Sequence, residues 1–150
     1  MNTIKQFLVN AKKNTYANNT GQTSSSRPGS YDLQYSEGDL VYLDSYLGTH
    51  SFSGQEIIWY RKEPIWSMNY YGDVLNSNFK SSFLKSALMF PSVASPYRGK
   101  SFYREGDYTY VMDVIGHFEK FSGSEKIFSK DLLTYELFFH GGKIVDKHFD

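Results

Sequence analysis

Two segments of the chain place apolar residues at helical spacing. In residues 3–15 the apolar side of the predicted helix consists of Ile4, Phe7, Leu8 and Ala11. Thr3 and Gln6 have the spacing of a capping box at its start. A second helix of the same kind is predicted over residues 78–89, and Pro91 just beyond it is a typical helix stop.

Most of the remaining chain alternates between apolar and polar residues, as half-buried β-strands do. The predicted strands are residues 31–35, 39–47, 52–61, 65–71, 108–115, 117–129 and 132–140, with a short tail strand near 143–146. Short connections between successive strands favour antiparallel pairing. Two stretches, residues 17–30 and the segment that ends at Gly106, are predicted to be loops.

The two halves of the chain resemble each other in sequence. Tyr-Ser-Glu-Gly-Asp at 35–39 matches Tyr-Arg-Glu-Gly-Asp at 103–107, and Phe-Ser-Gly-Gln-Glu at 52–56 matches Phe-Ser-Gly-Ser-Glu at 121–125. The spacing between the copies is too long for a solenoid repeat, and there are only two copies. We therefore interpret the pattern as one supersecondary unit duplicated inside a single domain.

The predicted fold is α+β, an internally duplicated helix-plus-three-strand unit in a single domain of residues 1–150, with pseudo-repeats at about 1–72 and 73–150. Two helices are too few to cover both faces of such a sheet, so we expect two helices on one face of an antiparallel sheet. The other face is then only partly covered, and a central cleft is expected between the two halves.

Composition excludes several classes of function. The formal net charge is zero, with 16 basic and 16 acidic residues, and the absence of a basic stripe argues against direct binding of nucleic acid. The chain has no cysteine, which excludes disulfides, thiolate zinc sites and cysteine nucleophiles. No pair of histidines has zinc-ligand spacing, so we expect no metal and no cofactor. No signal peptide and no membrane span is recognisable, so a cytoplasmic protein without membrane contact is the expectation.

Aromatic residues make up 18% of the chain, with 13 Tyr, 12 Phe and 2 Trp. Antiparallel sheets favour such residues, because their rings pack well on a pleated surface. Alternatively, the rings line a pocket for a flat or cationic ligand. The sequence leaves both interpretations open.

Side-chain alternation indicates which residues share a face of the predicted sheet. Six large residues of the third strands are expected to pack under the helices, namely Trp66, Met68, Tyr70, Tyr135, Leu137 and Phe139. The opposite parity of those strands, together with residues of the first strands, is expected to line the cleft. The candidate ligand-binding residues are Tyr42, Asp44, Asn69, Tyr71, Tyr110, Glu136 and His140.

Glu136 is the strongest of these candidates, because it lies in an apolar strand with no basic residue beside it in sequence. A partly buried carboxylate needs a cationic partner or a network of hydrogen bonds. The partner is either a cationic ligand held between tyrosine rings or a Lys or Arg on a neighbouring strand. By contrast, Glu56 and Glu125 recur at matching places in the two halves, which indicates a structural role.

We expect a small-molecule-binding, sensor-like domain that holds a hydrophobic or cationic ligand in an aromatic cleft between the two halves. One alternative is a small-molecule hydrolase of the same fold that uses Glu136 and His140. These residues would lie about 13 Å apart along one strand, so a partner such as Tyr71 or Asp44 on another strand would be needed. Another alternative is a module that binds a regulator protein or a second copy of itself through exposed aromatic residues.

Four segments carry distinctive motifs. They are Ser-Arg-Pro-Gly-Ser-Tyr-Asp at 26–32, Ile-Trp-Ser-Met-Asn-Tyr-Tyr-Gly at 65–72, Pro-Tyr-Arg-Gly at 96–99 and Tyr-Glu-Leu-Phe-Phe-His-Gly-Gly at 135–142. These motifs resemble those of an uncharacterised bacterial and archaeal domain family of unknown function, and the likeness covers essentially the whole chain. Some members of that family carry a helix-turn-helix ahead of this unit, which implies a role in regulation.

A duplicated unit of helix and strands with an aromatic cleft is also similar in architecture to the gyrase-inhibitor-like ligand-binding domains. That resemblance implies a hydrophobic cation as the ligand, held by aromatic residues and a buried Glu. Some relatives of that fold are hydrolases. The likeness lies in fold and in the character of the site, and a fold by itself does not establish a function.

Overall fold

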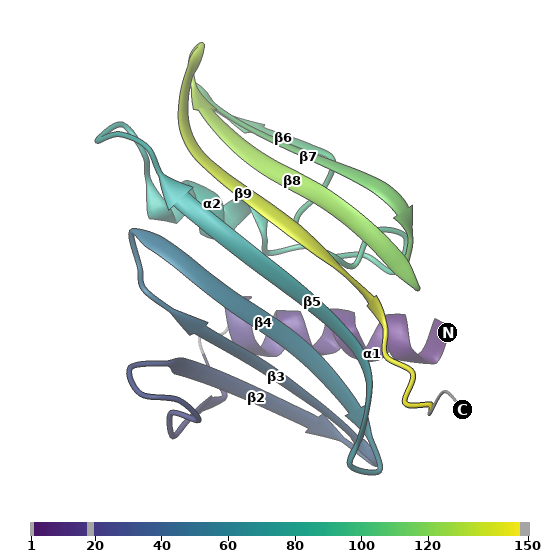
Figure 1. Ribbon diagram of the computed structural model, residues 1–150. Helices are drawn as coiled ribbons and strands as arrows, with labels where there is room; N and C mark the ends of the chain where they lie inside the picture. The colour runs from purple at the N-terminus through teal and green to yellow at the C-terminus, as the bar shows by residue number, and fades with distance from the viewer. Residues whose placement is uncertain (1, 18–19, 148–150) are drawn as a thin grey trace.

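A continuous antiparallel sheet with two short helices behind it makes up the structure (Figure 1). The computed structural model describes residues 2–17 and 20–147. The sheet has nine strands in the order β1-β2-β3-β4-β5-β9-β8-β7-β6. The strands are β1 (Gln22–Thr23), β2 (Tyr31–Glu37), β3 (Leu40–Leu47), β4 (Ser51–Tyr60), β5 (Glu63–Val74), β6 (Phe102–Glu105), β7 (Tyr108–His117), β8 (Lys120–Ser129) and β9 (Leu132–Lys143).

Both helices lie behind the sheet in Figure 1, so the face toward the viewer carries no helix. They are α1 (Asn2–Lys12), which continues into a π-helix η1 (Lys13–Ala17), and α2 (Ser81–Ala87). The predicted apolar side of α1 packs into the core through Phe7, Leu8 and Ala11. In the described part of the chain, no helix is long and apolar enough to cross a membrane.

The predicted α+β fold, a helix-plus-three-strand unit repeated twice, is wrong, because one large nine-strand antiparallel sheet makes up most of the structure and the helices are short. The helix expected over residues 78–89 shrinks to the seven residues of α2, and its N-cap Lys80 makes no side-chain capping bond. The central strands β5 and β9 extend instead to 12 residues each. A further strand, β6, pairs with β7 where a loop was expected, because Gly106 at φ +60° closes a tight turn between them.

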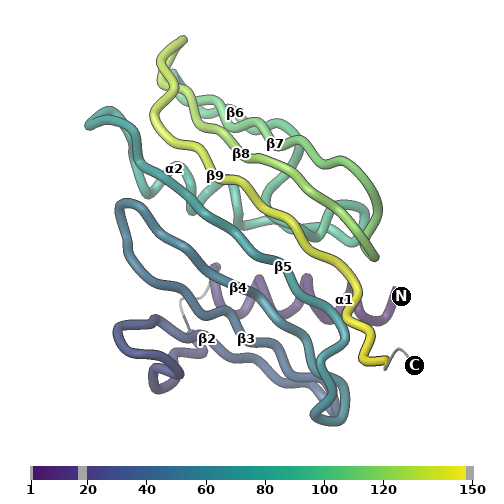
Figure 2. The backbone as a smooth tube through the Cα atoms, in the orientation of Figure 1, coloured from purple at the N-terminus to yellow at the C-terminus, as the bar shows by residue number. Residues whose placement is uncertain are grey.

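The strands β5 and β9 join the two halves of the sheet, as the backbone trace shows (Figure 2). They are antiparallel and form nine residue pairs, from Trp66 opposite Lys143 to Val74 opposite Tyr135. The halves therefore meet edge to edge as neighbouring strands of one sheet, so the expected central cleft does not separate them. The two halves share one irregularity, a register shift after Ile58 in β4 and after Ile127 in β8.

The core lies between the sheet and the helices. The six large residues expected under the helices are all buried, which confirms that part of the prediction: Trp66, Met68, Tyr70, Tyr135, Leu137 and Phe139. Trp66 stacks on Phe118 with a centroid distance of 4.9 Å, and its indole N–H donates to the Phe118 carbonyl oxygen at 3.0 Å. Burying an aromatic side chain of this size contributes about 2–3 kcal/mol. Many of the aromatic residues thus serve the core.

Candidate functional site

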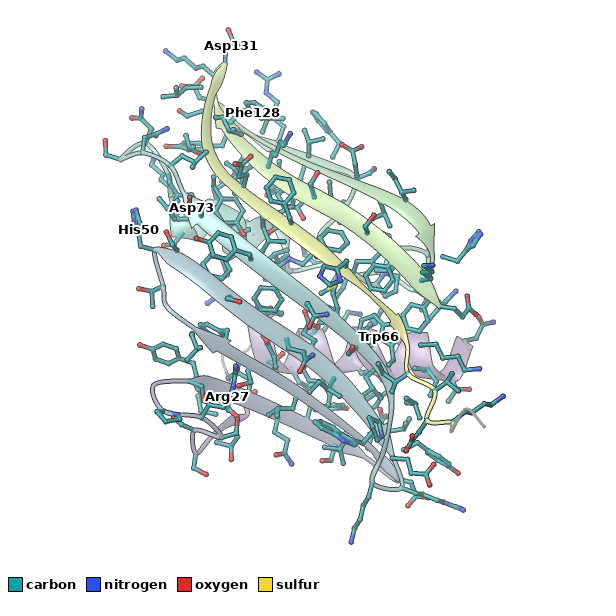
Figure 3. All side chains as sticks on the ribbon, in the orientation of Figure 1. Arg27, His50, Trp66, Asp73, Phe128 and Asp131 are labelled. Atoms are coloured by element: carbon teal, nitrogen blue, oxygen red, sulfur yellow. The ribbon has the colours of Figure 1, made fainter. Side chains whose placement is uncertain are left out.

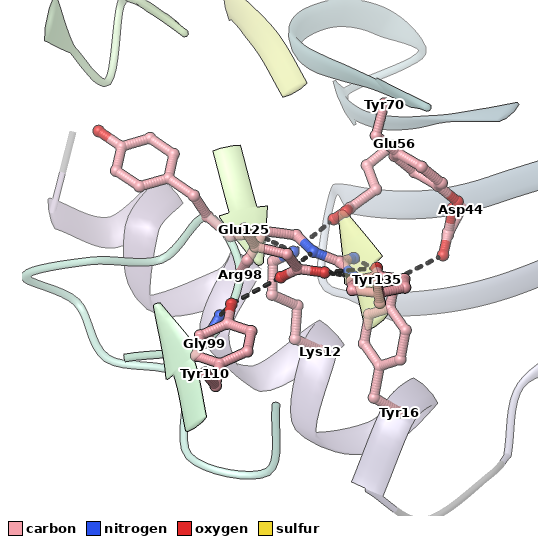
Figure 4. Close-up of polar contacts among 11 residues, drawn as sticks. Lys12, Tyr16, Asp44, Glu56, Tyr70, Arg98, Gly99, Tyr110, Glu125 and Tyr135 are labelled. Atoms are coloured by element: carbon pink, nitrogen blue, oxygen red, sulfur yellow. Dashed lines mark hydrogen bonds and ion pairs between the residues drawn. The ribbon is translucent and has the colours of Figure 1, made fainter. Parts of the chain in front are cut away.

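Five charged side chains are buried between the sheet and the helices (Figure 4). They are Lys12 on α1, Asp44 on β3, Glu56 on β4, Arg98 in the segment between α2 and β6, and Glu125 on β8, and none is more than 5% exposed. Charged groups are rarely buried in this way unless they are paired. Together with the tyrosines that bond to them, we call these residues the buried network.

In the first half of the sheet, Glu56 is paired with Lys12. The Lys12 Nζ donates to Glu56 Oε1 at 2.8 Å and to the Tyr97 carbonyl oxygen at 2.7 Å. The hydroxyl of Tyr42 also donates to Glu56 Oε1, at 2.8 Å. Burial lowers the pKa of Lys12, and the charge of Glu56 opposes that effect. Among the described residues, the other oxygen, Glu56 Oε2, has no hydrogen-bond partner.

In the second half, Glu125 is paired with Arg98 through two hydrogen bonds. The guanidinium donates from Nε to Oε2 at 3.0 Å and from Nη2 to Oε1 at 2.8 Å. The hydroxyls of Tyr110 and Tyr135 donate to the same two oxygens at 2.6 and 2.7 Å. Burial alone would raise the pKa of Glu125, but the Arg98 charge and these hydrogen bonds hold it below its usual value. Glu125 is therefore a fully satisfied carboxylate.

Gly99 permits the backbone next to Arg98 to pack closely against α2 and the Tyr110 ring. A Cβ at this position would lie 2.7 Å from the Ala87 carbonyl oxygen and 2.9 Å from the Tyr110 ring, both closer than real contacts. The Gly99 backbone N–H donates to the Tyr110 hydroxyl at 3.0 Å. The Pro-Tyr-Arg-Gly motif thus combines the buried cation with the residue that permits its close approach.

Asp44 differs from the other two buried acids, because no basic side chain forms an ion pair with it among the described residues. The hydroxyl of Tyr70 donates to Oδ1 at 2.6 Å, and that of Tyr16 donates to Oδ2 at 3.1 Å. Burial, followed by the charge of Glu56 directly opposite on β4, raises the pKa of Asp44 to about 7. The network therefore contains three acids and two bases, and Asp44 can either hold a proton or balance a further cation.

A pocket with a volume of about 430 Å³ lies against this part of the network. Its walls come from η1, β2, β3, β4, β5 and α2, and they are lined by Thr15, Tyr16, Leu33, Tyr46, Gly48, Thr49, Phe52, Tyr70, Ser81, Leu84, Lys85, Leu88 and Arg98. Three of these residues, Tyr16, Tyr70 and Arg98, also belong to the buried network. We call this cavity the helix-face pocket. Two of its lining residues, Tyr16 and Tyr70, donate hydrogen bonds to Asp44, so a ligand in the pocket would lie one residue away from this carboxyl.

The structure separates the predicted site residues onto two faces of the sheet. Tyr42, Asp44 and Tyr110 lie on the helix-covered face and are buried. The other four, Asn69, Tyr71, Glu136 and His140, lie on the uncovered face. The reason is the register of the strands. Asp44 lies opposite Glu56, and Glu56 lies opposite Met68, so these three side chains share the helix-covered face. Asn69 is the next residue after Met68, and its side chain therefore points to the other face. The expectation that all seven line one cleft is wrong.

Glu136 is half-buried, with a base opposite it on one neighbouring strand and an acid opposite it on the other. Lys126 on β8 lies directly opposite it on one side, and Asp73 on β5 lies opposite it on the other. The position of Lys126 favours a cross-strand base as the partner of Glu136 over a cationic ligand. His140 lies on the same strand but beyond Phe138, so the pair proposed for hydrolysis is not brought together.

The sequence interpretation missed the residues that pair with the buried acids. Lys12 ends the first helix and Arg98 lies in the Pro-Tyr-Arg-Gly motif, and each reaches a carboxylate far away in sequence. A signal was present for the acids themselves. Glu56 and Glu125 are each two residues before a buried isoleucine in a strand, so alternation places their side chains in the core.

Comparison with known proteins gives a family but no activity. Residues 44–144, which is more than half of the chain, match the model of a domain of unknown function, DUF5680. The chain therefore belongs to this family, which confirms the resemblance to an uncharacterised family. No curated protein and no solved structure shows a significant match. Within the described residues, no group of three or more acidic or histidine side chains could hold a metal ion.

Proposed function

We propose that this domain binds a hydrophobic organic cation in the helix-face pocket, with Asp44 as the buried charge that the ligand balances. The observation that carries the proposal is the unpaired acid. Glu56 and Glu125 each have a basic partner at 2.8 Å, whereas the partners of Asp44 in the described part of the chain are two tyrosine hydroxyls. Burial raises the pKa of both tyrosines, so their hydroxyls keep their protons and remain donors.

The walls of the pocket suit such a ligand. Four aromatic rings line it, those of Tyr16, Tyr46, Phe52 and Tyr70, and three leucines add apolar surface. Aromatic rings attract cations through the negative charge at their faces, most strongly where water is excluded. A volume of about 430 Å³ accommodates a small drug-like molecule.

The size of the charge effect can be estimated. A cation seated against the tyrosine hydroxyls, roughly 6 Å from the carboxylate, gains about 3 kcal/mol at an effective dielectric constant of about 20. That energy corresponds to about a hundredfold in affinity. The positive charge of Arg98 in the pocket wall is balanced by the negative charge of the Glu125 carboxylate, to which its guanidinium donates two hydrogen bonds. Lys85, the other basic residue of the wall, is exposed to solvent.

The difference between the halves of the sheet also supports this site. Glu125 on β8 lies opposite Met112, while Glu56 on β4 lies opposite Asp44. If the halves arose by duplication, as their sequences indicate, Asp44 is an acid of the first half that has no acidic counterpart in the second half. The proposed ligand is of the class bound by gyrase-inhibitor-like domains, with Asp44 in place of Glu136 as the charge partner.

Calorimetry with two ions of the same shape tests the proposal. Tetraphenylphosphonium is expected to bind, and tetraphenylborate, its anionic counterpart, is expected not to. Replacing Asp44 by Asn should weaken phosphonium binding by about tenfold or more. Replacing the carboxyl of Asp73, on the uncovered face, by an amide is the matched control and should leave binding unchanged. Equal affinity for the two ions, or an Asp44→Asn variant that binds as the wild type does, would refute the assignment.

A further inference from the structure

A second group of polar and aromatic side chains lies on the uncovered face of the sheet, along the seam between β5 and β9. Three successive cross-strand pairs occupy it, Asn69 opposite His140, Tyr71 opposite Phe138, and Asp73 opposite Glu136. Because alternate residues of a strand share a face, all six side chains point to the same side of the sheet. Figure 3 is viewed from this side, with Asp73 labelled near the end of β5. We call this row the seam ladder.

The middle pair of the seam ladder is an exposed aromatic platform. Tyr71 is 52% exposed and Phe138 is 53% exposed, although large rings are usually buried when packing alone decides their place. The two residues are direct neighbours across the strands. They border a hollow of about 450 Å³ whose other walls include Gln55, Asn69, His140 and Arg27. The Arg27 guanidinium donates to the Ser45 hydroxyl at 2.7 Å.

We propose that this hollow binds a neutral saccharide, with one sugar ring against Tyr71 and Phe138. A sugar ring has an apolar side made of C–H groups, which suits the face of an aromatic ring, and an edge of hydroxyl groups. Each hydroxyl both donates and accepts hydrogen bonds. A matching protein site therefore needs rings beside neutral groups of both kinds.

The amides next to the rings supply those groups. Gln55 Nε2 donates to Asn69 Oδ1 at 2.9 Å, which holds the two amides side by side. This contact leaves the Gln55 Oε1 acceptor and the Asn69 Nδ2 donors without a recorded partner among the residues described. His140, directly opposite Asn69, adds a ring nitrogen on the other side. An acceptor and a donor thus stand next to the aromatic platform in a fixed arrangement.

The charges of the ladder distinguish a saccharide from a nucleic acid, which could also stack on exposed rings. Asp73 and Glu136 lie opposite each other immediately beyond the rings. Lys126 lies opposite Glu136 on β8, and Arg27 lines the hollow. Two acids with these two bases do not form the run of basic residues that nucleic-acid sites place along the path of the backbone. Carboxylates accept hydrogen bonds from hydroxyls, so the same acids favour a polyol.

The test is a titration of the full-length, 15N-labelled protein with cellohexaose, maltohexaose, xylohexaose and chitohexaose, each at millimolar concentrations. At least one of the four should give saturable chemical-shift changes at the side-chain amides of Gln55 and Asn69. The variants Tyr71→Ala and Phe138→Ala should each weaken that binding by about tenfold or more. Because both rings are exposed, these variants are expected to fold. Phe90→Ala removes a similarly exposed ring outside the sheet and should leave the binding unchanged.

Three results would overturn the proposal. They are the absence of saturable shifts with all four sugars, shifts that persist in both ring variants, and a preference of this face for a single-stranded oligothymidylate. Self-association that the ring variants abolish would likewise assign the platform to a second copy of the chain. The site lies on the face opposite the helix-face pocket, so a failed sugar titration leaves the phosphonium experiment unaffected.

Discussion

Replacing Asp44 by Asn removes the acid of the buried network that lacks a basic partner. The change keeps the size of the side chain and one oxygen that can accept from Tyr16 or Tyr70. It abolishes the ability to ionise. In the wild type, burial and the charge of Glu56 raise the pKa of Asp44 from 3.8 to about 7. The substitution therefore isolates the contribution of this one titration to stability.

The sign follows from proton binding in the two states. Between about pH 4 and pH 7 the folded protein holds a proton at Asp44 that the unfolded chain has released. The free energy of unfolding therefore falls as the pH rises through this window and levels off above it. A carboxyl with a pKa of 3.8 when unfolded and about 7 when folded loses about 4 kcal/mol in total. Glu125, whose pKa is lowered, acts in the opposite sense and only below its unfolded value of 4.5.

Urea denaturation followed by tryptophan fluorescence measures the effect, because Trp66 is buried in the folded protein. Wild type and Asp44→Asn are compared at several pH values between about 4.5 and 8.5. The stability of the variant should rise relative to the wild type by about 3 kcal/mol across this range, since part of the total lies below pH 4.5. Asp113→Asn, at an exposed carboxyl on β7, is the control and should run parallel to the wild type. Parallel curves for Asp44→Asn would refute the assignment of the raised pKa.

Three further outcomes are expected. Arg98→Met leaves the Glu125 carboxylate buried without a cation and should cost about 3–5 kcal/mol in urea denaturation, while Arg61→Met, which breaks an exposed ion pair, should cost less than about 1 kcal/mol. Gly99→Ala should lower the melting temperature in calorimetry, since the added Cβ would lie 2.7 Å from a backbone oxygen, and an unchanged value would contradict the close approach. Leu84→Trp should fill the helix-face pocket and reduce tetraphenylphosphonium affinity in calorimetry without loss of stability; unchanged affinity would place the cation elsewhere.

Alternation along the chain was enough to locate most strands and to identify the buried side of the central ones. Trp66, Met68 and Tyr70 are buried as predicted, because a period of two depends only on the local backbone. The first helix was recognisable for the same reason, from the spacing of its apolar residues. Helix length was less well determined. Residues 78–89 have a helical pattern, but α2 spans only Ser81–Ala87. A turn from Asn76 to Phe79 precedes it, and Lys80 is extended and provides no side-chain cap.

The candidate site could be predicted only in part. Asp44, Tyr42 and Tyr110 were selected from sequence, yet they were grouped with residues of the opposite face. Alternation within one strand does not say which parity of the next strand shares its face. That depends on register, which is set by turns and by pairing across strands.

By itself, then, the sequence determined where most strands and the first helix form, that Asp44 is a candidate site residue, and that the two halves are similar in sequence. Only the tertiary structure decided that β5 pairs with β9, and that Lys12 and Arg98 reach Glu56 and Glu125 over 44 and 27 residues of chain. It also decided that no base among the residues described forms an ion pair with Asp44. The physical reason is that spacing and alternation are local properties of the chain, whereas strand order, register and the pairing of buried charges arise between segments far apart in sequence.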